Sequence, residues 1–309
     1  MRPVVNHVAV VGAGQMGTRI AQIFCEAGAI VLLYDSDAKV CERAVEKIRE
    51  FWLKNIQEKN TANMTLEQFA HATRNRVMIL NAHLYVASRL DRLAPVDFVV
   101  EAVTEDRAIK AQVLSTLDAI CKPNTILVTN TSTISIKELA KSVQRHKDKF
   151  MGMHFMNPPH VLTFLELIRG PKTSDETANT VFEIARWLNR NPILFASDIP
   201  GFSVNGMVMP IINEASLLVE RFIKKGMSFE GACEIVNDSF EGRVPTGGEP
   251  MGILRLADLI GIDTVVAGLR EMMKANRHYK PRGILTDLVV QGRLGRKTKI
   301  GFFDYDSGR

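Results

Sequence analysis

The chain has few cysteines, and no two of them lie close together in the sequence. Cys25, Cys41, Cys121 and Cys233 are the only four among 309 residues, and none has the Cys-x-x-Cys spacing of zinc sites and redox motifs. This excludes a disulfide-stapled secreted domain and a thiolate metal site. Isolated thiols are typical of proteins from a reducing compartment, so we expect a cytoplasmic protein without a metal site.

The sequence also lacks a membrane span and a nucleic-acid-binding pattern. The apolar segment His7–Gly12 is far shorter than the roughly 20 residues that cross a bilayer, and we expect no signal peptide. The net charge of +5 is compatible with an anionic partner. However, there is no arginine-rich run and no interleaving of aromatic and basic residues, so we expect neither nucleic acid nor a membrane as a partner. Two interpretations of the positive net charge remain. Either the partner is a phosphorylated small molecule, or the charge comes from scattered lysines that are simply solvated.

Composition and length predict two globular domains. Hydrophobic residues make up 46% of the chain and charged residues 24%, as in ordinary globular proteins. Up to about residue 197, short apolar runs alternate with helical patterns, which predicts an α/β domain with a mostly parallel sheet. From residue 198 to 309 the strand signal disappears and we expect an all-α domain. The expected strands are His7–Val11, Ala29–Tyr34, Val77–Leu80, Phe98–Glu101, Thr125–Asn130, Met151–His154, Leu165–Arg169 and Pro192–Ala196.

A glycine-rich segment links the first expected strand to the first expected helix. Its context distinguishes Gly12, Gly14 and Gly17 from an ordinary glycine turn. The first glycine permits a tight turn, the second lets the backbone approach a pyrophosphate, and the third lets the helix pack against the strand. The expected helix starts at about Met16, so the free N–H groups of Gln15 and Met16 and the positive end of the helix dipole face the phosphates. The segment predicts a Rossmann-type dinucleotide site.

An acidic residue follows the second expected strand and indicates which dinucleotide binds. Asp35 lies where a carboxylate can accept hydrogen bonds from the adenosine ribose. The same charge repels a 2′-phosphate, at roughly 4 kcal/mol for unit charges about 4 Å apart in an effective dielectric near 20. We therefore expect NAD rather than NADP as the cofactor.

Two titratable side chains in apolar strands form a candidate catalytic pair. His154 ends one expected strand, and Glu166 lies within the next. Burying a carboxylate is costly unless it is paired, so Glu166 needs a partner. If both strands end at the same edge of the sheet, Glu166 can orient the imidazole of His154 and stabilise its protonated form. A lone structural histidine is the alternative interpretation.

These motifs occur together in a known family, which this sequence resembles over nearly its whole length. The chain is similar to the L-3-hydroxyacyl-CoA dehydrogenases, including the bacterial 3-hydroxybutyryl-CoA dehydrogenases. The resembling segments are Val10–Gly17, Val99–Glu105, Asn130–Ser132, His154–Pro158 with Glu166, Asp198–Asn205, Pro250–Gly252, Ala257–Gly261, Gly295–Thr298 and Gly301–Tyr305.

The resemblance implies a role for each matching position. His154 corresponds to the catalytic base and Glu166 to its carboxylate partner. Ser132 and Asn205 correspond to residues that contact the substrate oxygen, and Ser132 also lies near the nicotinamide. The positions that contact the cofactor correspond to Glu105, Lys110, Asn157 and Lys297. The resemblance also implies an acyl-CoA substrate. It further implies a homodimer that the C-terminal helical domain forms through the apolar stripe of Val208–Phe222.

The sequence departs from the family pattern in several places. Thr133 replaces a second serine, Gly206 replaces an arginine, and the loop between Ser132 and His154 is one residue longer. Pro159–His160 is unusual after the catalytic histidine. The stretch from about Asn60 to His83, where the family's acyl-CoA-binding helices lie, does not align, so no CoA contact is assigned there.

Three functions are compatible with these residues. The first is interconversion of 3-hydroxyacyl-CoA and 3-ketoacyl-CoA with NAD. The second is oxidation of a small free 3-hydroxy acid, as in the related gulonate and carnitine dehydrogenases, which the double proline after Asn157 favours. The third is a noncatalytic protein that kept the fold, as some lens crystallins did. The complete set of Ser132, His154, Glu166 and Asn205 argues against the third.

Overall fold

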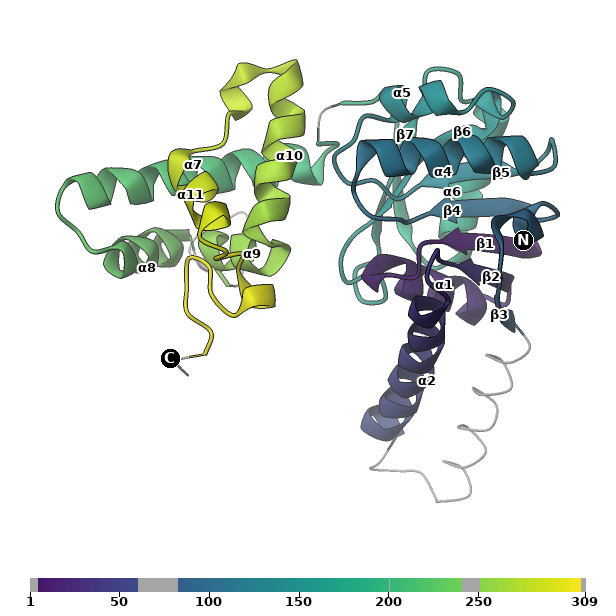
Figure 1. Cartoon of the computed structure of the whole chain (residues 1–309), viewed down its shortest axis with the longest axis horizontal. Helices are drawn as coiled ribbons and strands as arrows, with labels where there is room; N and C mark the ends of the chain where they lie inside the picture. Colours follow the sequence, from purple (N-terminus) through teal and green to yellow (C-terminus); the bar gives the residue numbers. More distant parts are fainter. Residues whose placement is uncertain (1–4, 61–82, 200, 241–250, 307–309) are drawn as a thin grey trace. The chain divides into compact units, whose positions relative to one another are not determined.

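The computed structural model describes residues 5–60, 83–199, 201–240 and 251–306, and the chain forms two units (Figure 1). One unit extends to Asp198 and the second begins at Ile199. The expected strand Val77–Leu80 lies outside the described residues. Each unit has its own hydrophobic core, so each is described separately.

The N-terminal unit is built on an eight-stranded sheet in the order β3-β2-β1-β4-β5-β6-β7-β8. All neighbouring strands are parallel except β6 and β7, which are antiparallel. The order reverses between β1 and β4, and this is the point where doubly wound sheets bind ligands. The strands are β1 (His7–Val11), β2 (Ile30–Tyr34), β3 (Leu84–Val86), β4 (Phe98–Glu101), β5 (Ile126–Thr129), β6 (Phe150–Phe155), β7 (Phe164–Arg169) and β8 (Asn191–Phe195).

Helices cover the sheet because alternate strand residues point to opposite faces and both faces are apolar. Side chains of α1, α2 and α6 join one core cluster with the sheet, and α4 and α5 pack against each other elsewhere in the unit. Two N-caps fit their sequence: Asp106 accepts from the Ile109 amide, and Ser174 from the Thr177 amide. The helices are α1 (Gln15–Glu26), α2 (Ala38–Asn60), α4 (Arg107–Ile120), α5 (Ile136–Leu139) and α6 (Asp175–Trp187).

The sheet corrects one expectation and adds a strand. The connection Met156–Thr163 between β6 and β7 is too short for a parallel crossover, which needs a dozen or more residues, so β7 runs back alongside β6. His154 and Glu166 are therefore directly opposite each other on two antiparallel strands, rather than at the ends of two parallel strands. The added strand is β3, a short edge strand whose Tyr85 and Val86 are exposed.

The C-terminal unit is helical over its described residues, apart from two isolated β-bridges near its end. Its last segment is held by Asp258, which is 1% exposed and accepts hydrogen bonds from the amides of Phe302 and Phe303 and the hydroxyl of Tyr305. A Cβ at Gly301 would lie 2.0 Å from this carboxylate, so only glycine fits there. The helices are α7 (Val204–Lys224), α8 (Phe229–Phe240), α9 (Ile253–Ile260), α10 (Ile262–Ala275) and α11 (Gly283–Val290).

Three further features of the described residues concern the cysteines, the lengths of apolar helices and the grouping of metal-binding side chains. All four cysteines are buried and free, and burial raises the pKa of Cys25 to about 12. Among the described helices, none is both long and apolar enough to span a membrane. No group of three or more His, Cys, Asp or Glu side chains suited to a metal ion occurs in this part of the chain.

Candidate active site

Four adjacent strands deliver the candidate residues to one edge of the sheet. The parallel strands β1, β4, β5 and β6 are consecutive in the sheet, so their carboxyl ends lie together. The glycine turn follows β1, Glu105 follows β4, Ser132 follows β5, and His154 lies near the end of β6. This edge includes the reversal of strand order between β1 and β4, where a ligand crevice is expected.

The glycine turn has the geometry of a dinucleotide-binding loop. Gly12 has φ of +100°, and a Cβ there would lie 2.5 Å from the Ala102 carbonyl oxygen. A Cβ at Gly17 would lie 1.8 Å from the Gly12 carbonyl oxygen, so the first turn of α1 packs directly on the loop. The position of a Cβ at Gly14 is open, with nothing within 4 Å. The three glycines thus permit the turn, the helix packing and close approach of a phosphate, and the residues fit NAD.

The start of α1 provides donors for that phosphate, and Asp35 borders the turn. Gly14 is the N-cap without a side-chain cap, so the amides of Gln15 and Met16 have no acceptor within the helix. One oxygen of Asp35 accepts a hydrogen bond from the Ala13 amide at 2.8 Å. The carboxylate therefore supports the turn and lies at the end of β2, the position expected for a ribose contact.

His154 and Glu166 form a buried hydrogen-bonded pair. The distance between His154 Nδ1 and Glu166 Oε2 is 2.6 Å, and the two residues are 7% and 0% exposed. The cross-strand register of β6 and β7 places them opposite each other. A carboxylate at this distance assigns the proton to Nδ1 and leaves Nε2 as the ring atom for proton exchange. The arrangement is that of a base with its orienting group.

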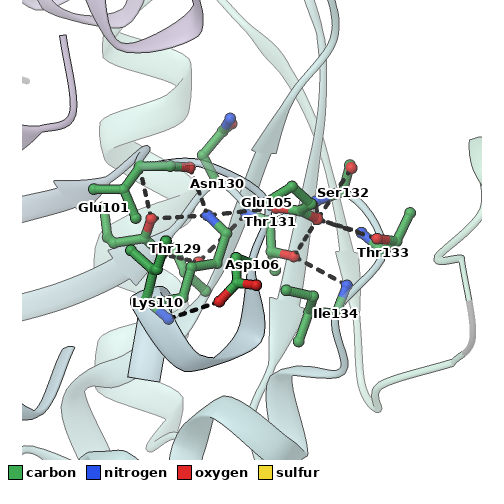
Figure 2. A network of polar contacts seen from close by, with 12 residues as sticks. Glu101, Glu105, Asp106, Lys110, Thr129, Asn130, Thr131, Ser132, Thr133 and Ile134 are labelled. Atoms are coloured by element: carbon green, nitrogen blue, oxygen red, sulfur yellow. Dashed lines mark hydrogen bonds and ion pairs between the residues drawn. The ribbon is translucent and has the colours of Figure 1, made fainter. Parts of the chain in front are cut away.

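Glu105 organises the loop that carries Ser132 (Figure 2). Its Oε1 accepts hydrogen bonds from the Ser132 amide at 2.8 Å, the Thr133 amide at 3.0 Å and the Thr131 hydroxyl at 2.7 Å. The Ser132 hydroxyl also donates to this oxygen, at 3.2 Å. Burial opposes ionisation of Glu105, but Lys110 and these donors outweigh it and hold the pKa of Glu105 below its usual value. An ionised carboxylate thus fixes the position of Ser132.

Lys110 is buried beneath this loop rather than at the surface. It is 1% exposed, and its Nζ lies 2.8 Å from Glu101 Oε1, 3.2 Å from the Val103 carbonyl oxygen and 3.4 Å from Glu105 Oε2. Glu101 is 0% exposed, and its second oxygen accepts from the Thr129 hydroxyl at 2.6 Å. The contacts of the ammonium group are with these protein oxygens, so Lys110 supports the site through Glu105.

Two further hydrogen bonds join the loops at the sheet edge. The side-chain oxygen of Asn130 accepts from the Phe155 amide at 2.9 Å, which ties the end of β5 to the residue after His154. The Gln15 amide group donates to Asn157 Oδ1 at 3.4 Å, which connects the glycine turn to the loop after β6. Hydrogen bonds therefore connect the glycine turn and the end of β5 to the segment that directly follows His154.

Two of the expected site residues lie in the C-terminal unit. Asn205 is at the start of α7, and Lys297 forms a short ion pair with Asp263, with Nζ 2.5 and 2.6 Å from its two carboxylate oxygens. Their contacts with substrate and cofactor stay predictions. The sequence interpretation overlooked Glu101, although a glutamate in an apolar strand was the same signal that identified Glu166. It also overlooked Asn130 as the residue that holds Phe155.

Comparisons with known proteins agree with this architecture. Residues 7–199 match the family model described as 3-hydroxyacyl-CoA dehydrogenase, NAD binding domain, and residues 244–305 match its C-terminal domain. The chain is 35% identical to the 3-hydroxybutyryl-CoA dehydrogenase of Clostridioides difficile, covering 97% of this chain and 99% of that protein. It is 31% identical to the human mitochondrial hydroxyacyl-coenzyme A dehydrogenase, over 98% of this chain and 92% of that protein.

A solved structure shares the whole fold. The (S)-3-hydroxybutyryl-CoA dehydrogenase PaaH1 from Ralstonia eutropha superposes with a TM-score of 0.83 at 32% identity, covering 97% of this chain and 99% of that one. The sheet order, the glycine turn and the matched N-terminal domain define an NAD-binding dehydrogenase fold. The chain belongs to the 3-hydroxyacyl-CoA dehydrogenase family.

Proposed function

We propose that this protein interconverts 3-hydroxyacyl-CoA and 3-ketoacyl-CoA. The observation that carries the proposal is the buried His154–Glu166 pair, 2.6 Å apart at the sheet edge that also holds the glycine turn. NAD, when bound, accepts the hydride from C3 of the hydroxyacyl group. The chain's own task is then to remove the hydroxyl proton and to hold the substrate in position.

His154 performs the proton transfer in this proposal. Glu166 bonds to Nδ1, so Nε2 takes the hydroxyl proton as the carbinol is oxidised. The imidazolium that forms is stabilised by the buried carboxylate, because opposite charges interact strongly where water is excluded. In the reverse direction the imidazolium returns the proton to the oxygen at C3. Ser132 and Asn205 contact that oxygen, and Ser132 is positioned for this by Glu105.

The substrate class is tested by a panel of NADH-oxidation assays with the purified protein. We expect turnover with acetoacetyl-CoA and with longer 3-ketoacyl-CoAs. In the opposite direction, measured as NAD reduction, a free 3-hydroxy acid should be oxidised at no more than a small fraction of the rate for the 3-hydroxyacyl-CoA. Preference for the free acid would support the alternative dehydrogenase, and the absence of turnover with every substrate would favour a noncatalytic protein.

Cofactor choice depends on Asp35 in this account. We expect Asp35→Ala to raise the KM for NAD and to narrow its advantage over NADP, because the variant loses a ribose acceptor and the repulsion of a 2′-phosphate. Steady-state kinetics with both cofactors measure the change. Because Asp35 also accepts from the Ala13 amide, Asp35→Asn is the control that keeps an acceptor without the charge. Equal use of NAD and NADP by the unaltered protein would contradict the assignment.

The C-terminal unit is proposed to form a homodimer. Only part of the apolar stripe on α7 is buried within the unit. Ile212 and Val219 lie in the unit's core, whereas Ile211 and Leu218 are 38% and 44% exposed. The exposed part borders an apolar groove of about 510 Å³ between α7 and α8. Contiguous apolar surface of this kind marks interaction sites.

Sedimentation velocity at micromolar concentration tests the dimer. We expect a dimer for the unaltered protein and a shift toward monomer for Leu218→Glu, because a buried unpaired charge opposes association. Lys225→Glu, at the exposed end of α7, is the control and should stay dimeric. A monomeric unaltered protein would contradict the proposal.

A further inference from the structure

The loop that leads from β6 to β7 is short of amide donors, because it contains two adjacent prolines. Pro158 and Pro159 have no N–H group, and the proposed proton transfer makes no use of this double proline. Within the loop, the Val161 and Leu162 amides both donate to the Pro158 carbonyl oxygen, at 3.1 and 3.0 Å. The carbonyl groups further along the loop therefore need donors from another part of the unit.

The side chain of Arg190 supplies two of these donors. It lies in the turn between α6 and β8, and its Nη1 donates to the carbonyl oxygens of Pro159 at 2.9 Å and Leu162 at 3.2 Å. Its Nε donates to the Leu188 carbonyl oxygen at 3.1 Å, which sets the direction of the guanidinium group. Because the guanidinium is planar and has five N–H donors in a fixed arrangement, this one side chain holds two points of the loop at once.

Two properties make these bonds stronger than an ordinary surface contact. Arg190 is half-buried, and burial lowers the pKa of its guanidinium while the nearby Glu26 opposes that shift. An arginine remains charged in a folded protein, and hydrogen bonds from a charged donor are roughly twice as strong as neutral ones. The next residue, Asn191, adds a backbone bond to the Thr163 carbonyl oxygen at 2.8 Å. The turn before β8 therefore holds the second half of the loop.

The first half of the same loop reaches the glycine turn. Asn157 Oδ1 accepts a hydrogen bond from the Gln15 amide group at 3.4 Å, and Gln15 is the first residue of α1. Asn157 directly precedes the two prolines, whose rings fix their φ angles and leave this part of the backbone little freedom. The position of Asn157 is therefore coupled to that of the Pro159 carbonyl group, which Arg190 holds.

We propose that Arg190 is a positioning residue for the cofactor site, which fixes the loop so that Asn157 lies beside the glycine turn. The inference rests on the proposed function, because Asn157 is assigned there to the cofactor of that reaction. A purely structural role is the alternative. The two roles differ in their consequence: loss of the guanidinium weakens NADH binding if Arg190 positions Asn157, and lowers only the free energy of unfolding if it does not.

The test is fluorescence titration of Arg190→Gln with NADH. Glutamine is polar but uncharged and too short to reach both carbonyl groups. We expect the Kd for NADH to rise about tenfold, the effect of losing one hydrogen bond from a charged donor. The KM for NADH with acetoacetyl-CoA should rise by the same factor. The kcat should change less than about twofold, because the strand register of β6 and β7 still holds the His154–Glu166 pair.

Two further variants complete the test. Arg190→Lys keeps the charge and can donate to one carbonyl group, so its Kd for NADH should lie between those of the unaltered protein and Arg190→Gln. Arg186→Gln is the matched control, because Arg186 is exposed in the last turn of α6, and its Kd should not change. An unchanged Kd in both Arg190 variants, or an equal rise in the control, would overturn the proposal. If the unaltered protein did not turn over acetoacetyl-CoA, the proposed function would fail, while the NADH titration would still report on Arg190.

Discussion

Replacing His154 by glutamine is expected to lower turnover by about 10²–10⁴-fold, the usual range for a single acid–base group. Glutamine keeps a polar side chain of similar length but cannot take up a proton. The affinity of the variant for NAD should change little, because His154 contacts Glu166 across the strands, whereas the cofactor is expected at the glycine turn. Steady-state kinetics with acetoacetyl-CoA and NADH, together with NADH titration, separate the two effects.

A second buried histidine provides the control for this variant. His146 is also fully buried, and its Nδ1 lies 2.8 Å from Asp118 Oδ1, but it is at the amino end of β6 rather than at the site. His146→Gln should lower the free energy of unfolding without lowering turnover per folded molecule. Equal losses of turnover in the two variants would mean that His154 acts only by supporting the fold.

Lys110→Met is expected to lower the free energy of unfolding by about 3–5 kcal/mol, the effect of removing one partner from a buried ion pair. The variant leaves the fully buried Glu101 without its cation, and it removes the charge that keeps Glu105 ionised. Because Glu105 then holds Ser132 less firmly, the KM for NADH should rise in the fraction that remains folded. Equilibrium denaturation measures the first effect and initial rates measure the second.

Lys122→Met is the matched control for that prediction. Lys122 pairs with Asp97 at 2.6 Å, but the two side chains are 42% and 26% exposed, so their pair contributes less than about 1 kcal/mol. Similar losses of unfolding free energy in the two lysine variants would show that the buried ion pair stabilises the protein no more than the exposed one. A stable Lys110→Met protein with a normal KM for NADH would mean that Lys110 and Glu101 do not support the site.

Much of the fold follows from local sequence patterns, and the exceptions have physical reasons. The apolar run His7–Val11 followed by the glycine turn predicts β1 and α1 because that context is local in the chain. The reversed direction of β7 depends on how many residues a crossover needs, which periodicity alone does not report. The edge strand β3 is only three residues long, which is too short for periodicity to distinguish a strand from a loop.

Site residues were predictable from the sequence where burial of a charged side chain is costly unless it has a partner. Glu166 in an apolar strand required a cation or donor, and His154 lies directly opposite it. Lys110 was expected at the cofactor on resemblance alone, and its burial against Glu101 became visible only in the folded structure.

The central claim is that His154 and Glu166 act together in one proton transfer coupled to hydride transfer. Single-turnover measurements of NADH oxidation by acetoacetyl-CoA test it in His154→Gln, Glu166→Gln and the double variant. We predict that both single variants are slow and that the double variant is scarcely slower than His154→Gln, because both residues serve the same step. Near-normal hydride transfer in His154→Gln, or fully additive losses in the double variant, would contradict the account.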